Sequence, residues 1–237
     1  MREFLLDEQN AYNFYVFNPL HIILLFITML IIFIFIKNKN KITKISFNKY
    51  NLIKNIGILI MFLNMTIYYA SKLIYGVYNI KVHLPLHLCL LCGYIFMIVN
   101  FFNIKKLKPL SIIIAFIGPI PATIFPEIYS TFDSFIFYNH IISHNVFFIL
   151  AIFIYLYEDI SINLKELFKS FLFLILIYII TYSLNITIGS NYIFSTNYPP
   201  HILDMFPFLH SFSPFLLLLI VGVTMLLITY YFLKKIK

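Results

Sequence analysis

A series of apolar runs, each close to 20 residues long, constrains what this chain can fold into. A helix needs about 20 consecutive apolar residues to cross the hydrocarbon core of a bilayer. Short polar segments separate the runs, and none of them is long enough to form a second domain. We therefore predict an all-α membrane protein, with a single seven-helix transmembrane domain over residues 1–237. The runs lie at about residues 19–36, 55–71, 84–102, 109–125, 135–157, 168–188 and 214–233.

The composition supports this class of protein. Hydrophobic residues make up 62% of the chain and charged residues 11%, whereas about a quarter of the residues of a soluble domain are charged. The formal net charge of +8 could suggest a nucleic-acid partner, but the lysines fall in the loops between the apolar runs. We therefore interpret the charge as a topology signal, and we expect membrane lipids rather than nucleic acid as partners.

The distribution of basic residues predicts the orientation. With the loop after the first run placed in the cytoplasm, the loops after the first, third and fifth runs and the C-terminal segment hold 14 of the 17 Lys and Arg residues. Cytoplasmic loops are enriched in these residues, so we predict seven spans with the N-terminus outside and the C-terminus cytoplasmic. The absence of Trp beside 28 Phe and 18 Tyr suggests an AT-rich bacterial genome, and we expect a bacterial plasma membrane.

All seven histidines fall on the predicted outer side. A polar or ionisable side chain inside a membrane is costly unless it faces protein or water, so this pattern predicts a polar, hydrated cavity at the outer end of the helices. The alternative is that interfacial histidines simply tolerate lipid head groups. The histidines are His21, His83, His87, His140, His144, His201 and His210.

The stretch from His83 to Cys92 contains two histidines, Pro85 and both cysteines of the chain. Proline suits the first helical position, so Pro85 predicts a helix start. The thiolate form of a cysteine is favoured near a helix N-terminus. Cys89 is therefore a candidate nucleophile, and a site that opens sideways to lipid favours acyl transfer as its chemistry.

Two histidines are candidate partners of Cys89. His144, at similar depth in the fifth run, is the better candidate for a base, whereas His87 lies on roughly the opposite helical face and suits a structural or substrate-facing role. A zinc site is an alternative. His83 and His87, and likewise His140 and His144, are four residues apart and would share a helical face, which could supply ligands for a zinc-dependent membrane hydrolase.

The cysteines have other interpretations. The C-x-x-C spacing of Cys89 and Cys92 is typical of redox helices, but the chain has no further cysteine to pass electrons on. The simpler interpretation is that both thiols are buried in apolar surroundings and contribute only to packing. A third functional class is non-catalytic, a lipid- or ligand-binding membrane protein. We name no metal ligand and expect no cofactor.

Two further segments could line the cavity. Gly118-Pro119-Ile120-Pro121 interrupts the fourth run, and proline removes a helical hydrogen bond. This predicts either a kinked packing helix or a broken helix beside a pocket. The loop after the sixth run carries polar residues that could bind a ligand in the cavity or form an ordinary turn. They are Asn185, Asn191, Tyr192 and Asp204.

Two blocks of the sequence resemble a known family. They are Leu84-Pro85-Leu86-His87-Leu88-Cys89 and Gly189-Ser190-Asn191-Tyr192, accompanied by Pro126-Glu127, His144, Asn185 and Pro199-Pro200. Together they are similar to the YwaF-type bacterial integral membrane proteins, which are related to the vertebrate transmembrane protein 164 family. The similarity covers about residues 50–235. The vertebrate relatives are described as phospholipid acyltransferases with a cysteine nucleophile, so the resemblance implies Cys89 as nucleophile with His87 and His144 as histidine partners.

Overall fold

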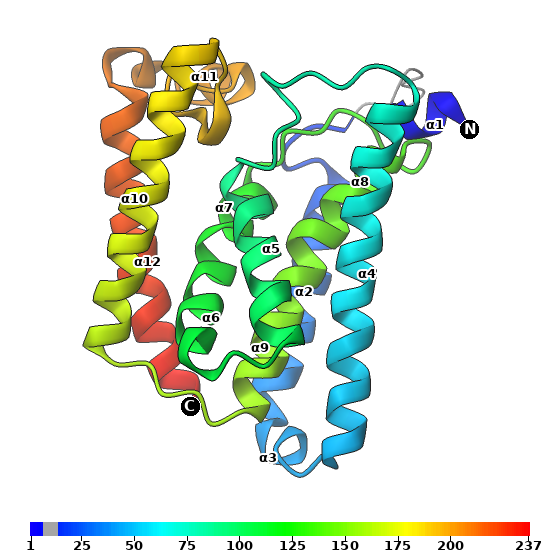
Figure 1. Ribbon diagram of the computed structural model, residues 1–237, viewed down its shortest axis with the longest axis vertical. Coiled ribbons are helices and arrows are strands. Elements are labelled where there is room, and N and C mark those ends of the chain that lie inside the picture. Colours follow the sequence, from blue (N-terminus) through cyan, green and yellow to red (C-terminus); the bar gives the residue numbers. More distant parts are fainter. Residues whose placement is uncertain (7–13) are drawn as a thin grey trace.

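The computed structural model describes residues 1–6 and 14–237, which form an all-helical bundle without a strand in those ranges (Figure 1). The first and last residues lie at opposite ends of the bundle. The elements are α1 (Arg2–Leu6), α2 (Pro19–Lys37), α3 (Lys39–Ile42), α4 (Phe47–Ile74), α5 (Leu88–Phe101), η1 (Lys105–Leu107), α6 (Lys108–Ile117), α7 (Pro119–Ile124), α8 (Phe135–Ile141), the π-helical η2 (Ile142–Val146), α9 (Phe147–Tyr157), α10 (Leu164–Ile188), η3 (Tyr192–Phe194), α11 (Pro200–Met205), η4 (Pro207–Ser211) and α12 (Pro214–Ile236).

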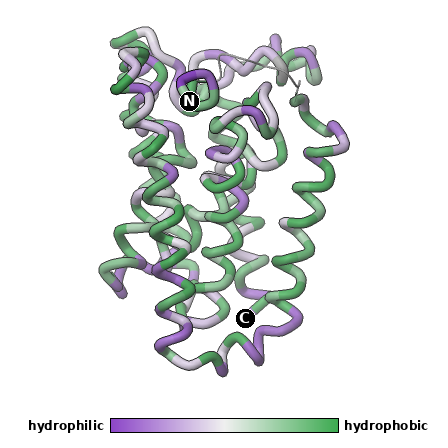
Figure 2. Tube along the Cα trace, turned by 90° about the vertical axis from the view of Figure 1, so that its right-hand side faces the viewer, coloured by the Kyte–Doolittle hydropathy of each residue, from purple (hydrophilic) through white to green (hydrophobic). Residues whose placement is uncertain are grey.

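Six helical stretches of the described chain are long and apolar enough to cross a membrane. Hydrophobic residues occupy the middle of the bundle, while hydrophilic residues gather toward its ends (Figure 2). We call the end that carries residues 37–46, 102–108, 158–163 and 234–237 the lysine-rich end, and the opposite end the histidine end. The spans are Pro19–Lys37, Phe47–Ile74, Lys105–Ile124, Phe135–Tyr157, Leu164–Ile188 and Pro214–Ile236.

The third predicted span is shorter than the sequence suggests. The helix covers only Leu88–Phe101, about 21 Å at 1.5 Å per residue. Pro85 does not begin it, because residues 84–86 form a turn in which the Leu86 N–H donates to the Leu84 carbonyl (2.7 Å). His87 is instead the N-cap residue. The interpretation of Pro85 as the helix start was therefore wrong.

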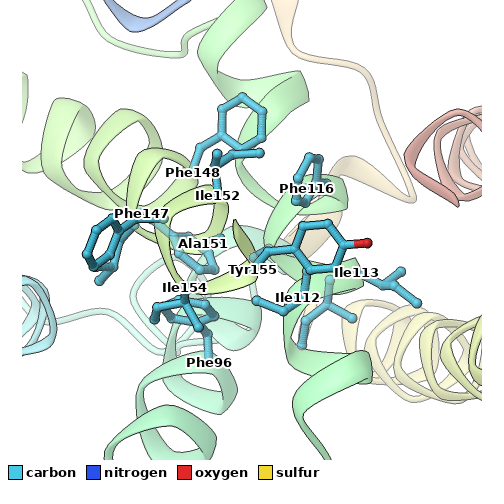
Figure 3. Close-up of a cluster of buried hydrophobic side chains, with 14 of the residues drawn as sticks. Phe96, Ile112, Ile113, Phe116, Phe147, Phe148, Ala151, Ile152, Ile154 and Tyr155 are labelled. Carbon is cyan, nitrogen blue, oxygen red and sulfur yellow. The ribbon is translucent and has the colours of Figure 1, made fainter. Parts of the chain in front are cut away.

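The core lies between the two most buried stretches, α6–α7 and α8–α9. Side chains from α5, α6 and α9 interdigitate there (Figure 3), including Phe96, Ile112 and Phe147. The Phe96 and Phe147 rings lie 4.9 Å apart. Helices α2, α4, α10 and α12 surround this centre and expose many large apolar side chains, as expected of surfaces that face lipid.

Two lysines that the sequence analysis assigned to loops lie inside the bundle. Lys54 is in the second turn of α4, which begins at Phe47, and Lys108 begins α6. Each is only 6% exposed. Long apolar stems let lysine cover hydrophobic surface, so the charge pattern alone could not separate these buried lysines from solvated ones.

Candidate functional site

The chemistry-bearing side chains meet where α4, α5, α7 and the π-helical segment pack together at the histidine end. His144 lies in that segment and is buried. Its Nδ1 lies 2.8 Å from the His140 carbonyl oxygen. A carbonyl can only accept, so Nδ1 carries the proton and Nε2 keeps its lone pair. Within the described chain, Nε2 is buried without a hydrogen-bond partner, which is the state that a general base requires.

The local backbone explains how His144 reaches this position. Residues Ile142–Val146 form a π-helical turn, and such turns occur mostly as single interruptions of α-helices, frequently at functional sites. Within this turn the ring of His144 lies 4.3 Å from the ring of His140. The two rings are thus adjacent, as their spacing of four predicts.

The broken helix α6–α7 presents backbone carbonyls to two further histidines. His21 Nε2 lies 2.9 Å from the Thr123 carbonyl oxygen, and His140 lies next to the backbone of Ala122. These contacts join α2 and α8 to α7. The Gly118–Pro121 interruption is therefore a break in a buried, packed helix, as the first of the two alternatives predicts, and α7 beyond it contacts the histidine cluster.

Cys89 lies at the same level as His144. Helices α5 and α9 both end at the lysine-rich end, so they run in the same direction. A Cβ atom at Gly93 would lie 4.0 Å from the Phe147 ring. Cys89 lies one helical turn before Gly93 on α5, and the π-helical segment directly precedes Phe147. Cys89 and this segment, which packs against α5, are therefore at about the same level of the bundle.

The Cys89 sulfur lies near the first backbone N–H groups of α5, those of Cys89 and Leu90. The N–H groups in the first turn of a helix have no partner within the helix. A Cβ at Gly118 would lie only 3.1 Å from the Cys89 Cα, so the break before α7 needs a residue without a side chain. Cys92 is fully buried, whereas Cys89 is partly exposed.

Four polar residues near this centre were missed by the sequence analysis. Tyr69 on α4 lies within electrostatic range of Cys89, and its hydroxyl is buried without a partner among residues 1–6 and 14–237. The Asn64 amide donates to the Ser143 hydroxyl at 3.0 Å, while Asn64 Oδ1 and Asn139 Nδ2 are buried and unsatisfied in the described chain. Buried polar groups are normally hydrogen-bonded, so these atoms form a polar environment fitted to water or a polar ligand group.

His87 connects the site to the loop after α10. Its ring lies 5.2 Å from the Tyr192 ring and is close enough to His144 for electrostatic interaction. Tyr192 is buried, and its hydroxyl donates to the Ile80 carbonyl (2.5 Å) and accepts from the Leu84 N–H (2.8 Å). Tyr192 thus anchors the non-helical segment before α5.

The other predicted cavity residues hold their own loop or lie apart. Asn185 is buried and makes four hydrogen bonds, to both backbone groups of Tyr192 and to the hydroxyls of Ser190 and Ser195. The Asn191 side-chain oxygen Oδ1 accepts from the N–H and the hydroxyl of Thr196 and from the N–H of Asn197. Asp204 is exposed on α11. Tyr192 therefore contacts His87, which lies within electrostatic range of His144, whereas Asp204 lies apart from them.

The proposed His83–His87 helical face is absent. Both residues precede α5, and His83 Nδ1 accepts from the Asn79 N–H at 2.8 Å. In the described part of the chain, no three His, Cys, Asp or Glu side chains converge as metal ligands, so the zinc alternative gains no support from this geometry.

Comparison with known proteins identifies one family. None of the curated proteins or solved structures compared with this chain matches it. The model of the TMEM164 family matches residues 16–233, which include every candidate site residue, five of the six long apolar spans and all but the last three residues of the sixth. The chain is therefore a multi-pass membrane protein that belongs to the TMEM164 family.

Proposed function

We propose that this protein is a phospholipid acyltransferase in which Cys89 is the nucleophile. The observation that carries the proposal is His144 Nε2, a buried basic nitrogen whose tautomer is fixed by the His140 carbonyl and which has no partner among the described residues. A thiol level with such a nitrogen can be activated by it. The TMEM164 family membership supports the same chemistry through the resemblance of the Leu84–Cys89 block.

The reaction has two balanced steps. The Cys89 thiol adds to the ester carbonyl of a phospholipid while its proton passes to His144 Nε2. The glycerol oxygen then leaves and takes that proton, giving an acyl thioester and a lysophospholipid. In the second step a hydroxyl of the acceptor lipid loses its proton to Nε2 and attacks the thioester. The departing Cys89 sulfur recovers the proton, and no cofactor is consumed.

The surroundings favour a lipid substrate. Cys89 lies in the first turn of α5. The other three residues of this turn, 88, 90 and 91, are leucines, and all four side chains are partly exposed. An acyl chain can lie along such apolar surface while its ester group reaches the polar groups of Tyr69 and Asn64. The N–H groups around the sulfur and the unsatisfied Asn139 amide are candidate donors for the developing oxyanion. His87 is a positioning residue in this scheme.

An acyl-transfer assay tests the proposal. Purified protein in mixed micelles would be given a phospholipid with a tagged acyl chain and a lysophospholipid acceptor. We expect transfer by the unmodified protein and by Cys92→Ala, and a loss of at least about 1,000-fold in Cys89→Ala. Equal transfer by both variants would overturn the role of Cys89. Lipid binding without transfer by the unmodified protein would instead favour the non-catalytic lipid-binding class.

The same proposal includes a seven-span bacterial plasma-membrane topology with the N-terminus outside. Helix α5 is shorter than the roughly 30 Å hydrocarbon core, and residues 83–87 would complete the crossing as non-helical backbone. Such backbone requires protein partners at membrane depth, and the bond from the Leu84 N–H to the Tyr192 hydroxyl is one of them. The 14 basic residues on one side support the orientation.

Reporter fusions test this topology. A reporter fused after Lys237 is expected to lie in the cytoplasm, and one inserted beside Pro200 is expected to lie outside the cell. Two further reporters, inserted before α5 at residues 77–82 and after it at residues 102–104, test its crossing, because both would lie on the same side if α5 does not cross and the span count is six. If the two sides are exchanged, the orientation is reversed.

A further inference from the structure

The hydroxyl of Tyr69 is a buried donor that the chain leaves unpaired. Tyr69 lies in the last two turns of α4, and its hydroxyl has no hydrogen-bond partner anywhere in the two described ranges. The hydroxyls of Tyr155, Tyr178 and Tyr192, by contrast, each donate to a backbone carbonyl. A buried polar group without a partner is costly. The Tyr69 hydroxyl is therefore suited to an acceptor that the protein itself does not supply.

The packing of α4 against α5 places this side chain opposite Cys89. Helix α4 ends and α5 begins at the histidine end (Figure 1), so the two helices run in opposite directions. They approach closely at Gly93, where a Cβ atom would lie only 2.8 Å from the Met65 side chain. Tyr69 lies one turn after Met65, and Cys89 lies one turn before Gly93. Residues four apart share a helical face, so one turn closer to the histidine end Tyr69 and Cys89 face each other.

The surroundings of the Tyr69 ring agree with this register. Tyr69 is within electrostatic range of two residues of α5, Cys89 and Tyr94. Its ring also packs edge-on against the ring of Tyr68, with the ring centroids 5.2 Å apart. Neighbouring side chains thus hold the ring in place, and the hydroxyl remains available to a bound molecule beside the thiol.

The position beside a candidate nucleophile decides which acceptor this hydroxyl suits. When the Cys89 thiol adds to an ester carbonyl, negative charge develops on the carbonyl oxygen. A hydrogen-bond donor that is already fixed at that oxygen stabilises the transition state. A phenolic O–H can donate without bringing a charge into the membrane. His144 takes the thiol proton in the proposed reaction, so the oxygen requires a separate donor.

We propose that the Tyr69 hydroxyl donates a hydrogen bond to the carbonyl oxygen of the acyl group that Cys89 attacks. The inference rests on the proposed acyl transfer and adds a catalytic residue from α4. Tyr69 keeps its proton in both steps. It stabilises the oxyanion that forms when the thiol adds to the ester, and again the one that forms when the acceptor hydroxyl attacks the thioester.

The variant Tyr69→Phe removes this hydroxyl and keeps the ring. We expect kcat for acyl transfer to fall about 100-fold, with KM nearly unchanged, because the hydrogen bond strengthens only as the oxygen becomes charged. The unfolding temperature should stay the same or rise, since the variant loses a buried hydroxyl that had no partner.

Tyr155→Phe is the matched control. The Tyr155 hydroxyl donates to the Leu233 carbonyl at 2.9 Å, at the lysine-rich end. Its removal should lower the unfolding temperature and leave kcat unchanged. Unchanged kcat in Tyr69→Phe, or an equal loss in both variants, would overturn the role of Tyr69 while acyl transfer by Cys89 stands. If the unmodified protein neither transfers acyl groups nor forms an acyl-enzyme, the proposed function itself fails, and the role of Tyr69 with it.

Alkylation by iodoacetamide distinguishes a hydrogen bond to the carbonyl from one to the sulfur. This reagent reacts with the thiolate at a saturated carbon, so no oxyanion forms. In a Cys92→Ala background, Cys89 is the one remaining cysteine of the chain. Adding Tyr69→Phe should then leave the rate of alkylation unchanged. If alkylation slowed as much as acyl transfer, the hydroxyl would act on the Cys89 sulfur, and the proposal would be overturned.

Discussion

Replacing His144 with glutamine is expected to lower the rate of acyl transfer by about 100- to 10,000-fold, the usual contribution of a general base. Glutamine occupies a similar volume, and its amide N–H can still donate to the His140 carbonyl that the His144 ring now contacts. It has no basic nitrogen to take the Cys89 proton. The loss should therefore appear in the rate constant of the chemical step, measured with saturating tagged phospholipid, while the unfolding temperature changes little.

His210→Gln is the matched control, because His210 is exposed on η4 and lies outside the cluster around His144. It should transfer acyl groups at the rate of the unmodified protein. Near-normal transfer by His144→Gln would assign the base to another residue and would leave His144 as a packing residue of the π-helical turn.

Replacing Asn185 with alanine is expected to destabilise the loop after α10 by about 2–5 kcal/mol, since a buried polar group left without its partner costs about 1–3 kcal/mol. The amide of Asn185 uses both its donors and both its acceptor positions. Without it, the N–H and C=O of Tyr192 lose their partners. The effect should be measured as a lower denaturant midpoint for unfolding in detergent.

Asn197→Ala provides the comparison, because Asn197 is exposed in the same loop and its side chain makes one long contact, 3.4 Å to Thr196. Asn197→Ala should change the free energy of unfolding by less than about 0.5 kcal/mol. If Asn185→Ala kept full stability but lost lipid affinity, Asn185 would be a ligand-binding residue, as the sequence pattern predicts, and not an anchor of the loop.

Periodicity and composition were sufficient to predict most of the fold. The predicted fifth run coincides with Phe135–Tyr157, and the first run with Pro19–Lys37 to within one residue. Such agreement follows because a bilayer imposes one length and one chemistry on each span. The start of α5 was predicted wrongly, because the bonds from Tyr192 to Ile80 and Leu84 hold the preceding segment out of the helix. No local pattern reports a contact between residues more than 100 positions apart.

The candidate site was only partly predictable for the same reason. Residue type alone singled out Cys89 and His144. The π-helical turn around His144 carries no sequence signal, because Ile142–Val146 reads as ordinary helix. The unsatisfied Tyr69 hydroxyl and the buried Lys54 are likewise consequences of packing. Tyrosines and lysines near the ends of membrane helices are common, and their partners become visible only in the folded chain.

Detection of the covalent intermediate tests the central claim most directly. Protein mixed with the tagged phospholipid, without an acceptor, would be quenched with acid and analysed by peptide mass spectrometry. The account predicts an acyl group on the peptide that contains Cys89, released by neutral hydroxylamine as a thioester, present in Cys92→Ala and absent in Cys89→Ala. Acylation of Cys92 alone, or transfer to an acceptor without any acyl-enzyme in a folded and active sample, would contradict it.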